Sequence, residues 1–341
     1  MKASSTDTTS ARKENATYAG PDQTQRTWQR LKPLIGSQHF GLIAALIVLI
    51  VVLSLGAPYF MTVRNFTNVL QQVSFLGIIA MGMTLVIVCG EIDISVGSAM
   101  ALYSSLIAVL NFRRGWPLGL TIVLALVIGI CVGLFAGYIR HRFKIPSFIV
   151  TLALLSSLRG AALWMTNASP IAIPDRAFAF LGSGRIFGIV PFPLLVFIVI
   201  SLVYAFVSTR TVFGRSVYAV GGNPEAARIS GISLLRVRML VFAGTGLLAA
   251  VSAVMLSSLI GSGNAGLGSG AEFQVIAAVI VGGTSLYGGR GSIWGTVLGV
   301  LFIGLLTNGM VLLNVNQYGQ MVAQGVIILG AVLASETLRR P

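Results

Sequence analysis

The stretch that decides the fold is VSFLGIIAMGMTLVIVCGEIDISVGSAMALYSSLIAVL, residues 73–110. Two long apolar runs flank a short polar break, and about 20 apolar residues are enough to cross the hydrocarbon core of a membrane as a helix. The break contains Glu91 and Asp93, two of only nine carboxylates in a chain of 341 residues. The pattern predicts two membrane-spanning helices joined by an acidic connection.

The whole composition agrees with a membrane protein. Hydrophobic residues make up 55% of the chain and charged residues only 9%, whereas soluble domains carry about 25% charged residues. We expect an all-α, polytopic membrane protein with about ten transmembrane helices. The apolar segments lie at 40–58, 68–88, 94–111, 117–138, 147–166, 190–208, 238–260, 272–287, 293–313 and 319–336.

The chain has a net charge of +14, and its Lys and Arg residues are unevenly placed along the sequence. Basic residues gather in the N-terminal tail and in the loops at 139–146 and 209–237. Basic loops stay in the cytoplasm, so this distribution predicts that both termini are cytoplasmic. The basic excess is therefore a topology signal, and we expect no nucleic-acid partner.

The polar first 39 residues are rich in Ser, Thr and Gln and predict a disordered cytoplasmic tail. Residues 40–338 then form the transmembrane domain, with a cytoplasmic loop at 209–237. Two cysteines and two histidines without metal-ligand spacing predict no metal site.

Nucleotide-binding motifs are absent from the sequence. The nearest string to a phosphate-binding loop, GTSLYGGR at 283–290, lacks the lysine and hydroxyl that hold phosphate and magnesium. GSGNAG at 261–266 matches a dinucleotide fingerprint only literally, because it follows an apolar span rather than a strand. We therefore expect no ATP hydrolysis and no cofactor in this chain.

The loop at 209–237 contains the signals of a short helix. Asn223 can cap its start, Pro224 suits the first position, and Gly231 is a natural stop. Glu225 and Arg228 share one face at i, i+3 spacing. Two turns are unstable alone in water, so the helix either packs on its own membrane domain or docks onto a cytoplasmic partner.

Four stretches together resemble one known family. They are EIDISVGS (91–98), TLALLSSLRGAALWMTNASP (151–170), GRSVYAVGGNPEAARISGI (214–232) and IAAVIVGGTSLYGGRGSIWGTVLG (276–299). They are similar to the permease subunits of bacterial ABC importers for monosaccharides, most closely the ribose type, from about residue 40 onward.

The resemblance implies a set of partners and a place in the cell. ATP and magnesium would bind a separate cytoplasmic ATPase subunit, a periplasmic protein would bind the sugar, and a second permease chain would complete the pore in the bacterial inner membrane. The coupling helix that enters the ATPase would comprise Glu225, Ala226, Ala227, Arg228 and Gly231.

Candidate path residues are polar groups within apolar spans. Gln71, Gln72 and Ser74 lie in the second span, and Asn308 and Asn314 in or beside the ninth. Such amides either contact a sugar or only join helices. Arg159 lies inside a span, where a charge costs roughly 3 kcal/mol on insertion scales. It either lines the path or bonds helix carbonyls or Glu272.

Two roles are open for Glu91 and Asp93: capping a helix, or gating the transport path. Asp93 can accept from the amide of Ser95 or Val96 at a helix start, whereas Glu91 is a candidate gate. Val86–Ser98 also parallels Val279–Ser292 with a one-residue gap, a possible internal repeat. Gly129, Gly133 and Gly137 form a stripe that predicts close helix packing.

Two other functions remain open. A relative in the same family would import another small polar solute, such as a signalling furanose. A secondary transporter would instead use ions, with Glu91, Asp93 and Arg159 as the relay. Uptake by the isolated chain would separate the second alternative from an importer.

Overall fold

The computed structural model describes residues 38–337, which are almost entirely helical. The helices are α2 (Gln38–Gly56), α3 (Val63–Val88), α4 (Val96–Ala108), the π-helix η1 (Val109–Arg113), α5 (Leu118–Arg142), α6 (Ser147–Thr166), α7 (Arg176–Ser183), α8 (Phe192–Arg210), α9 (Val212–Gly222), α10 (Pro224–Ile229), α11 (Leu234–Ile260), α12 (Ala271–Val281), α13 (Ile293–Leu312) and α14 (Gln317–Thr337). The tail predicted for residues 1–39 lies outside the described residues, except for its last two positions.

Four short strands complete the described part of the chain. β1 (Ile171–Ala172) pairs antiparallel with β4 (Ser262–Gly263), and β2 (Arg185–Ile186) pairs antiparallel with β3 (Val190–Pro191). They lie in the connections between helices, so the architecture is all-α, as predicted.

Seven described helices are long and apolar enough to cross a membrane, judged by length and composition. They are α3, α4 with η1, α5, α6, α8, α11 and α13. α2 packs against α13, and α14 packs against α12. The chain is a multi-pass membrane protein.

Helix α3 forms the centre of the bundle. In the most apolar 18-residue stretch of α3, 83% of the residues are buried. The corresponding share is 22% in both α5 and α6 and 28% in α8. The outer helices therefore expose apolar side chains over wide faces, which lipid covers. α3 begins at Val63, earlier than predicted, because the Thr62 hydroxyl caps it by accepting from the Asn65 amide.

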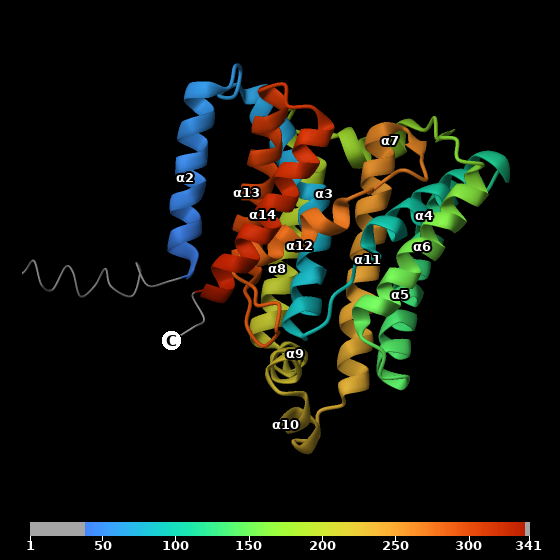
Figure 1. Cartoon of the computed structure of the whole chain (residues 1–341). Helices are drawn as coiled ribbons and strands as arrows, with labels where there is room; N and C mark the ends of the chain where they lie inside the picture. Colours follow the sequence, from blue (N-terminus) through green and yellow to red (C-terminus); the bar gives the residue numbers. More distant parts are fainter. Residues whose placement is uncertain (1–37, 338–341) are drawn as a thin grey trace, which may run out of the picture.

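Two helices start inside the bundle. Figure 1 shows the connection from the lower end of α3 rising before α4 begins. In this connection Glu91, Asp93 and Ser95 are buried. The predicted apolar segment 272–287 is wrong in length, because α12 has only 11 residues and ends before Gly282. It spans about 16 Å, roughly half of the hydrocarbon core.

The predicted glycine stripe packs helix α5 directly on helix α11. A Cβ on Gly133 would lie 2.2 Å from the Phe242 carbonyl oxygen, and one on Gly129 would lie 2.6 Å from the Gly246 carbonyl oxygen. Only hydrogen fits at such contacts, which confirms that the stripe serves helix packing.

Candidate functional site

A cavity of about 370 Å³ lies among the central helices. Its polar lining comes from Gln72, Ser269, Gln274 and Thr307, and its apolar lining from Val73, Phe75, Leu76, Ile79, Met100, Leu256, Leu259, Gly268, Ala271 and Gly304. No lining residue is charged. Its size falls in the range of about 300–1,000 Å³ that is typical of small-molecule sites.

The structure separates the predicted path residues. Gln72 lines the cavity, whereas Gln71 donates from Nε2 to the carbonyl of Gly182, 2.6 Å away. Asn308 is buried and exchanges hydrogen bonds with Asn65. Of these three amides, only Gln72 belongs to the cavity.

Sequence reasoning missed three polar lining residues. Gln274 lies in the short helix α12, and Ser269 lies in the loop before it. Thr307 lies in α13 one position before Asn308, and its hydroxyl has no hydrogen-bond partner among the described residues. The sequence signal available for Thr307 was its i+3 spacing from Gly304, which places both residues on one side of the helix.

The starts of α4 and α12 meet beside this cavity. A Cβ on Gly97 would lie 2.1 Å from Oε2 of Glu272 and 2.3 Å from the Gly268 carbonyl oxygen. Glu272 is 6% exposed. Since both helix starts carry a partial positive charge, this carboxylate stabilises two convergent N-termini.

Arg159 holds the loop that leads to α12. Its Nη1 donates to the carbonyls of Ala265 and Leu267, at 2.6 and 3.0 Å. It is absent from the lining of the 370 Å³ cavity, and among the described residues no ion pair joins it to Glu272. Its contacts match the structural alternative, bonding to carbonyls.

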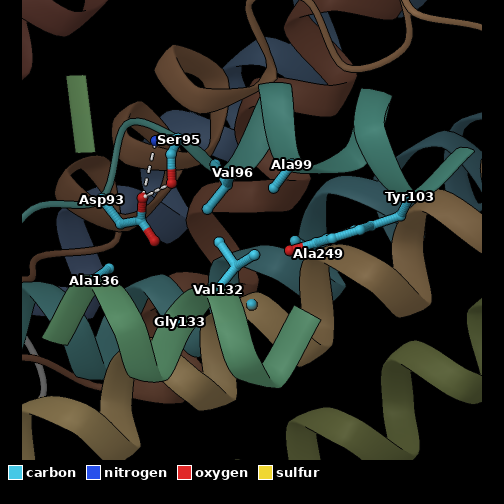
Figure 2. A pocket seen from close by; sticks show the side chains of 10 residues that line it. Asp93, Ser95, Val96, Ala99, Tyr103, Val132, Gly133, Ala136 and Ala249 are labelled. Carbon is cyan, nitrogen blue, oxygen red and sulfur yellow. Dashed lines mark hydrogen bonds between the residues drawn. The ribbon is translucent and has the colours of Figure 1, made fainter. Parts of the chain in front are cut away.

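Asp93 faces a second cavity of about 10 Å³, room for about one water molecule. Figure 2 shows Asp93 and Tyr103 on opposite sides of it, with Val132 of α5 between them. Asp93 Oδ1 accepts from the Ser95 amide at 2.9 Å and the Ser95 hydroxyl at 2.6 Å. The amide contact is the expected one, but Ser95 itself occupies the capping position of α4, so Asp93 precedes the cap by two residues.

Glu91 lies between two arginines from different helices. Its Oε1 accepts from Nε of Arg140 at 2.6 Å and lies 2.8 Å from Nε of Arg238. Arg140 lies near the end of α5 and Arg238 near the start of α11. Glu91 is only 2% exposed, so this buried ion cluster ties three segments together.

The two parallel stretches contain similar helix ends, but α10 and α13 end in the same way, so these ends do not test the possible internal repeat. At the end of α3, Gly90 donates to the Ile87 carbonyl and Glu91 to the Val86 carbonyl. At the end of α12, Gly283 and Thr284 donate to Ile280 and Val279 in the same way. Both glycines have positive φ, the arrangement of a Schellman cap.

The 209–237 loop forms two helices, of which α9 was not predicted. α10 begins as predicted, because the Asn223 side chain accepts from the amides of Glu225 and Ala226. Gly231 follows with φ +82°. Figure 1 places α10 at the lowest point of the fold.

Two charged residues form a pair on the exposed side of α10. Arg228 Nη2 lies 2.5 Å from Glu225 Oε1, and both side chains are exposed. The hydrogen bond from Arg228 holds the pKa of Glu225 below its ordinary value. Ala227 is buried against the domain, whereas Ile229 is exposed.

The described residues thus form a helical membrane protein with an uncharged cavity among its central helices. Residues 65–332 match the family model described as "Branched-chain amino acid transport system / permease component". The chain belongs to this permease family.

Curated relatives match most of the chain. "Probable ABC transporter permease protein YphD" of Escherichia coli is 48% identical over 87% of this chain and 89% of its own. "Ribose import permease protein RbsC" of Haemophilus influenzae is 40% identical over 86% and 92%. "Xylose transport system permease protein XylH" of Escherichia coli is 35% identical over 89% and 93%.

Proposed function

We propose that this chain is the permease subunit of an ATP-binding-cassette importer that carries a monosaccharide of the ribose or xylose kind across the bacterial inner membrane. The relatives named for ribose and xylose transport support the substrate class. The observation that carries the proposal is the lining of the 370 Å³ cavity, which is polar but uncharged.

The cavity chemistry favours a neutral polyol over an amino acid. The amides of Gln72 and Gln274 both donate and accept, and the Thr307 hydroxyl is free to bond a sugar hydroxyl. An amino acid carries two charges, and burying them without charged partners is costly. Phe75 adds an apolar face for the sugar ring.

The exposed surface of α10 supports docking of an ATPase subunit. Glu225, Ala226, Arg228 and Gly231 are exposed, while Ala227 anchors the helix to the domain. In this proposal the separate ATPase chain binds ATP and magnesium, and a periplasmic protein delivers the sugar. A second permease chain completes the pore. The apolar helices α2, α12 and α14 join the seven candidate spans named above to give ten membrane segments, with both termini cytoplasmic.

The ion-coupled alternative finds no support in the geometry. It needs Glu91, Asp93 and Arg159 to act as one relay, but each has different fixed partners. A furanose importer would use the same uncharged cavity, so sugar competition during uptake is the way to separate it from a ribose or xylose importer.

Reconstitution of the whole importer in liposomes tests the proposal. With the ATPase and binding protein present, ATP should drive uptake of radiolabelled ribose or xylose, and the permease alone should move neither. Gln72→Met should lower uptake by about tenfold, the effect of one lost hydrogen bond. Gln71→Met is the matched control outside the cavity, and equal uptake by both variants would contradict the assignment of the path.

A further inference from the structure

The buried carboxylate of Glu91 joins the α3–α4 connection to helices α5 and α11. It belongs to the connection from α3 to α4, but its partners Arg140 and Arg238 belong to α5 and α11. The cluster has one acid and two guanidinium groups, and Arg238 Nη1 lies 3.4 Å from His141 Nδ1. Glu91 is therefore the anion that keeps two cations close together.

Arg238 follows closely in the chain on α10, the helix that faces the ATPase in the proposed function. Helix α10 ends at Ile229 and α11 begins at Leu234. The Ile232 amide donates to the Ala227 carbonyl at 3.0 Å, which fixes the short link between them. A displacement of α10 therefore reaches Arg238 through one turn of α11.

Arg140 is joined to the same movement through α11, because α5 packs on α11 at its glycines and a Cβ on Gly137 would lie 3.0 Å from the Arg238 carbonyl oxygen. It lies near the end of α5, whose next residues lead to α6 rather than to the cytoplasmic helices. Its distance to Glu91 is the shorter of the two, 2.6 Å against 2.8 Å. Because α5 and α11 are packed together, both arginines move with α11, and Glu91 joins them to the α3–α4 connection.

Helix α4, which follows the α3–α4 connection, reaches the cavity. Gly97 touches Glu272 and Gly268, while Met100 lines the cavity itself. The connection and the start of α4 thus lead from the Glu91 cluster to the cavity wall within ten residues, Glu91 to Met100.

We propose that Glu91 is a positioning residue that makes the α3–α4 connection, and with it the cavity wall, follow the movement of α10. This inference rests on the proposed docking of the ATPase at α10. When α11 is displaced, Arg238 draws the Glu91 carboxylate with it. Without the anion the two arginines repel each other, so α11 moves while the connection stays behind.

The test is the number of sugar molecules moved per ATP hydrolysed by the complete transporter in liposomes. Glu91→Gln should assemble and hydrolyse ATP, but its sugar-to-ATP ratio should fall by about tenfold, as expected for a lost coupling contact. Asp175→Asn, which alters a carboxylate that caps α7, should keep the wild-type ratio. An unchanged ratio in Glu91→Gln would overturn the inference.

A comparison of the two arginines distinguishes positioning from stability. Arg140→Gln and Arg238→Gln should each lower the sugar-to-ATP ratio of the assembled transporter, whereas a purely structural role predicts a lower yield of folded protein with an unchanged ratio. These variants test the inference even if Glu91→Gln fails to assemble, and a wild-type ratio in both would overturn it. If the wild-type complex moves no sugar with ATP, it is the proposed function that fails instead.

Discussion

Asn65 and Asn308 exchange two hydrogen bonds between helices α3 and α13. Asn65 Nδ2 donates to Asn308 Oδ1 at 3.1 Å, and Asn308 Nδ2 donates to Asn65 Oδ1 at 2.8 Å. Both residues are buried, and a third bond joins Asn65 Nδ2 to the Phe60 carbonyl. The pair fixes one end of α3 to α13. Asn308 is therefore engaged with Asn65, and it is not among the residues that line the cavity.

Asn308→Ala should therefore reduce stability rather than sugar recognition. It leaves Asn65 with unsatisfied polar atoms, which costs about 1–3 kcal/mol. The neighbouring variant Thr307→Val should show the opposite pattern, because the Thr307 hydroxyl has no hydrogen-bond partner to lose among the described residues. Thermal unfolding in detergent and uptake in liposomes measure the two effects. Reduced uptake by fully stable Asn308→Ala protein would return this residue to the path.

Asp93→Asn should keep both assembly and most transport. An amide oxygen can still accept from the Ser95 amide and hydroxyl, which the Asp93 carboxylate does now. Asp93→Ala removes both bonds from a buried site and should lower the yield of folded protein. Size-exclusion profiles and uptake compare the variants. Loss of uptake in both with normal assembly would instead indicate a gate that needs the charge.

Arg159→Ala should loosen the loop that precedes α12. The Ala265 and Leu267 carbonyls lose their shared donor, and each buried orphan carbonyl costs about 1–3 kcal/mol. Hydrogen exchange of the amides in residues 261–270 should become faster, while exchange in α5 stays the same. Unchanged exchange in this loop would show that Arg159 does not hold it.

Two neighbouring glycines at the end of α9 provide a sharp comparison. A Cβ on Gly221 would lie 1.7 Å from the Val88 carbonyl oxygen, whereas one on Gly222 would meet nothing within 4 Å. Gly221→Ala should therefore destabilise the protein by about 1–3 kcal/mol or more. Gly222→Ala should be neutral or stabilising, because alanine favours a helix. Equal melting temperatures would contradict the close contact between α9 and the end of α3.

Long apolar runs made most of the fold predictable. A helix that crosses lipid needs a continuous apolar stretch, so the sequence fixes its position within a few residues. The length of α12 was predicted wrongly, because the predicted segment continued through Leu286 and Tyr287 although Gly282 and Gly283 end the helix. Helix α9 was missed because three of its 11 residues are glycines, which disfavour a helix.

The candidate site was less predictable, because polar residues in a span look alike in sequence. Gln71 and Gln72 are adjacent, yet about 100° of helix rotation separates them, and only one faces the cavity. The partners of Glu91 lie about 50 and 150 positions away in the chain. Only the folded arrangement brings such residues together.

The glycine contact between α5 and α11 limits how this protein can change shape. Sliding either helix by one residue would bring Val132 or another larger side chain against backbone atoms that now admit only hydrogen. The two helices must therefore move as one rigid body. Any conformational cycle is then a rotation of this body against the rest of the bundle, with its hinges in the connections that flank it.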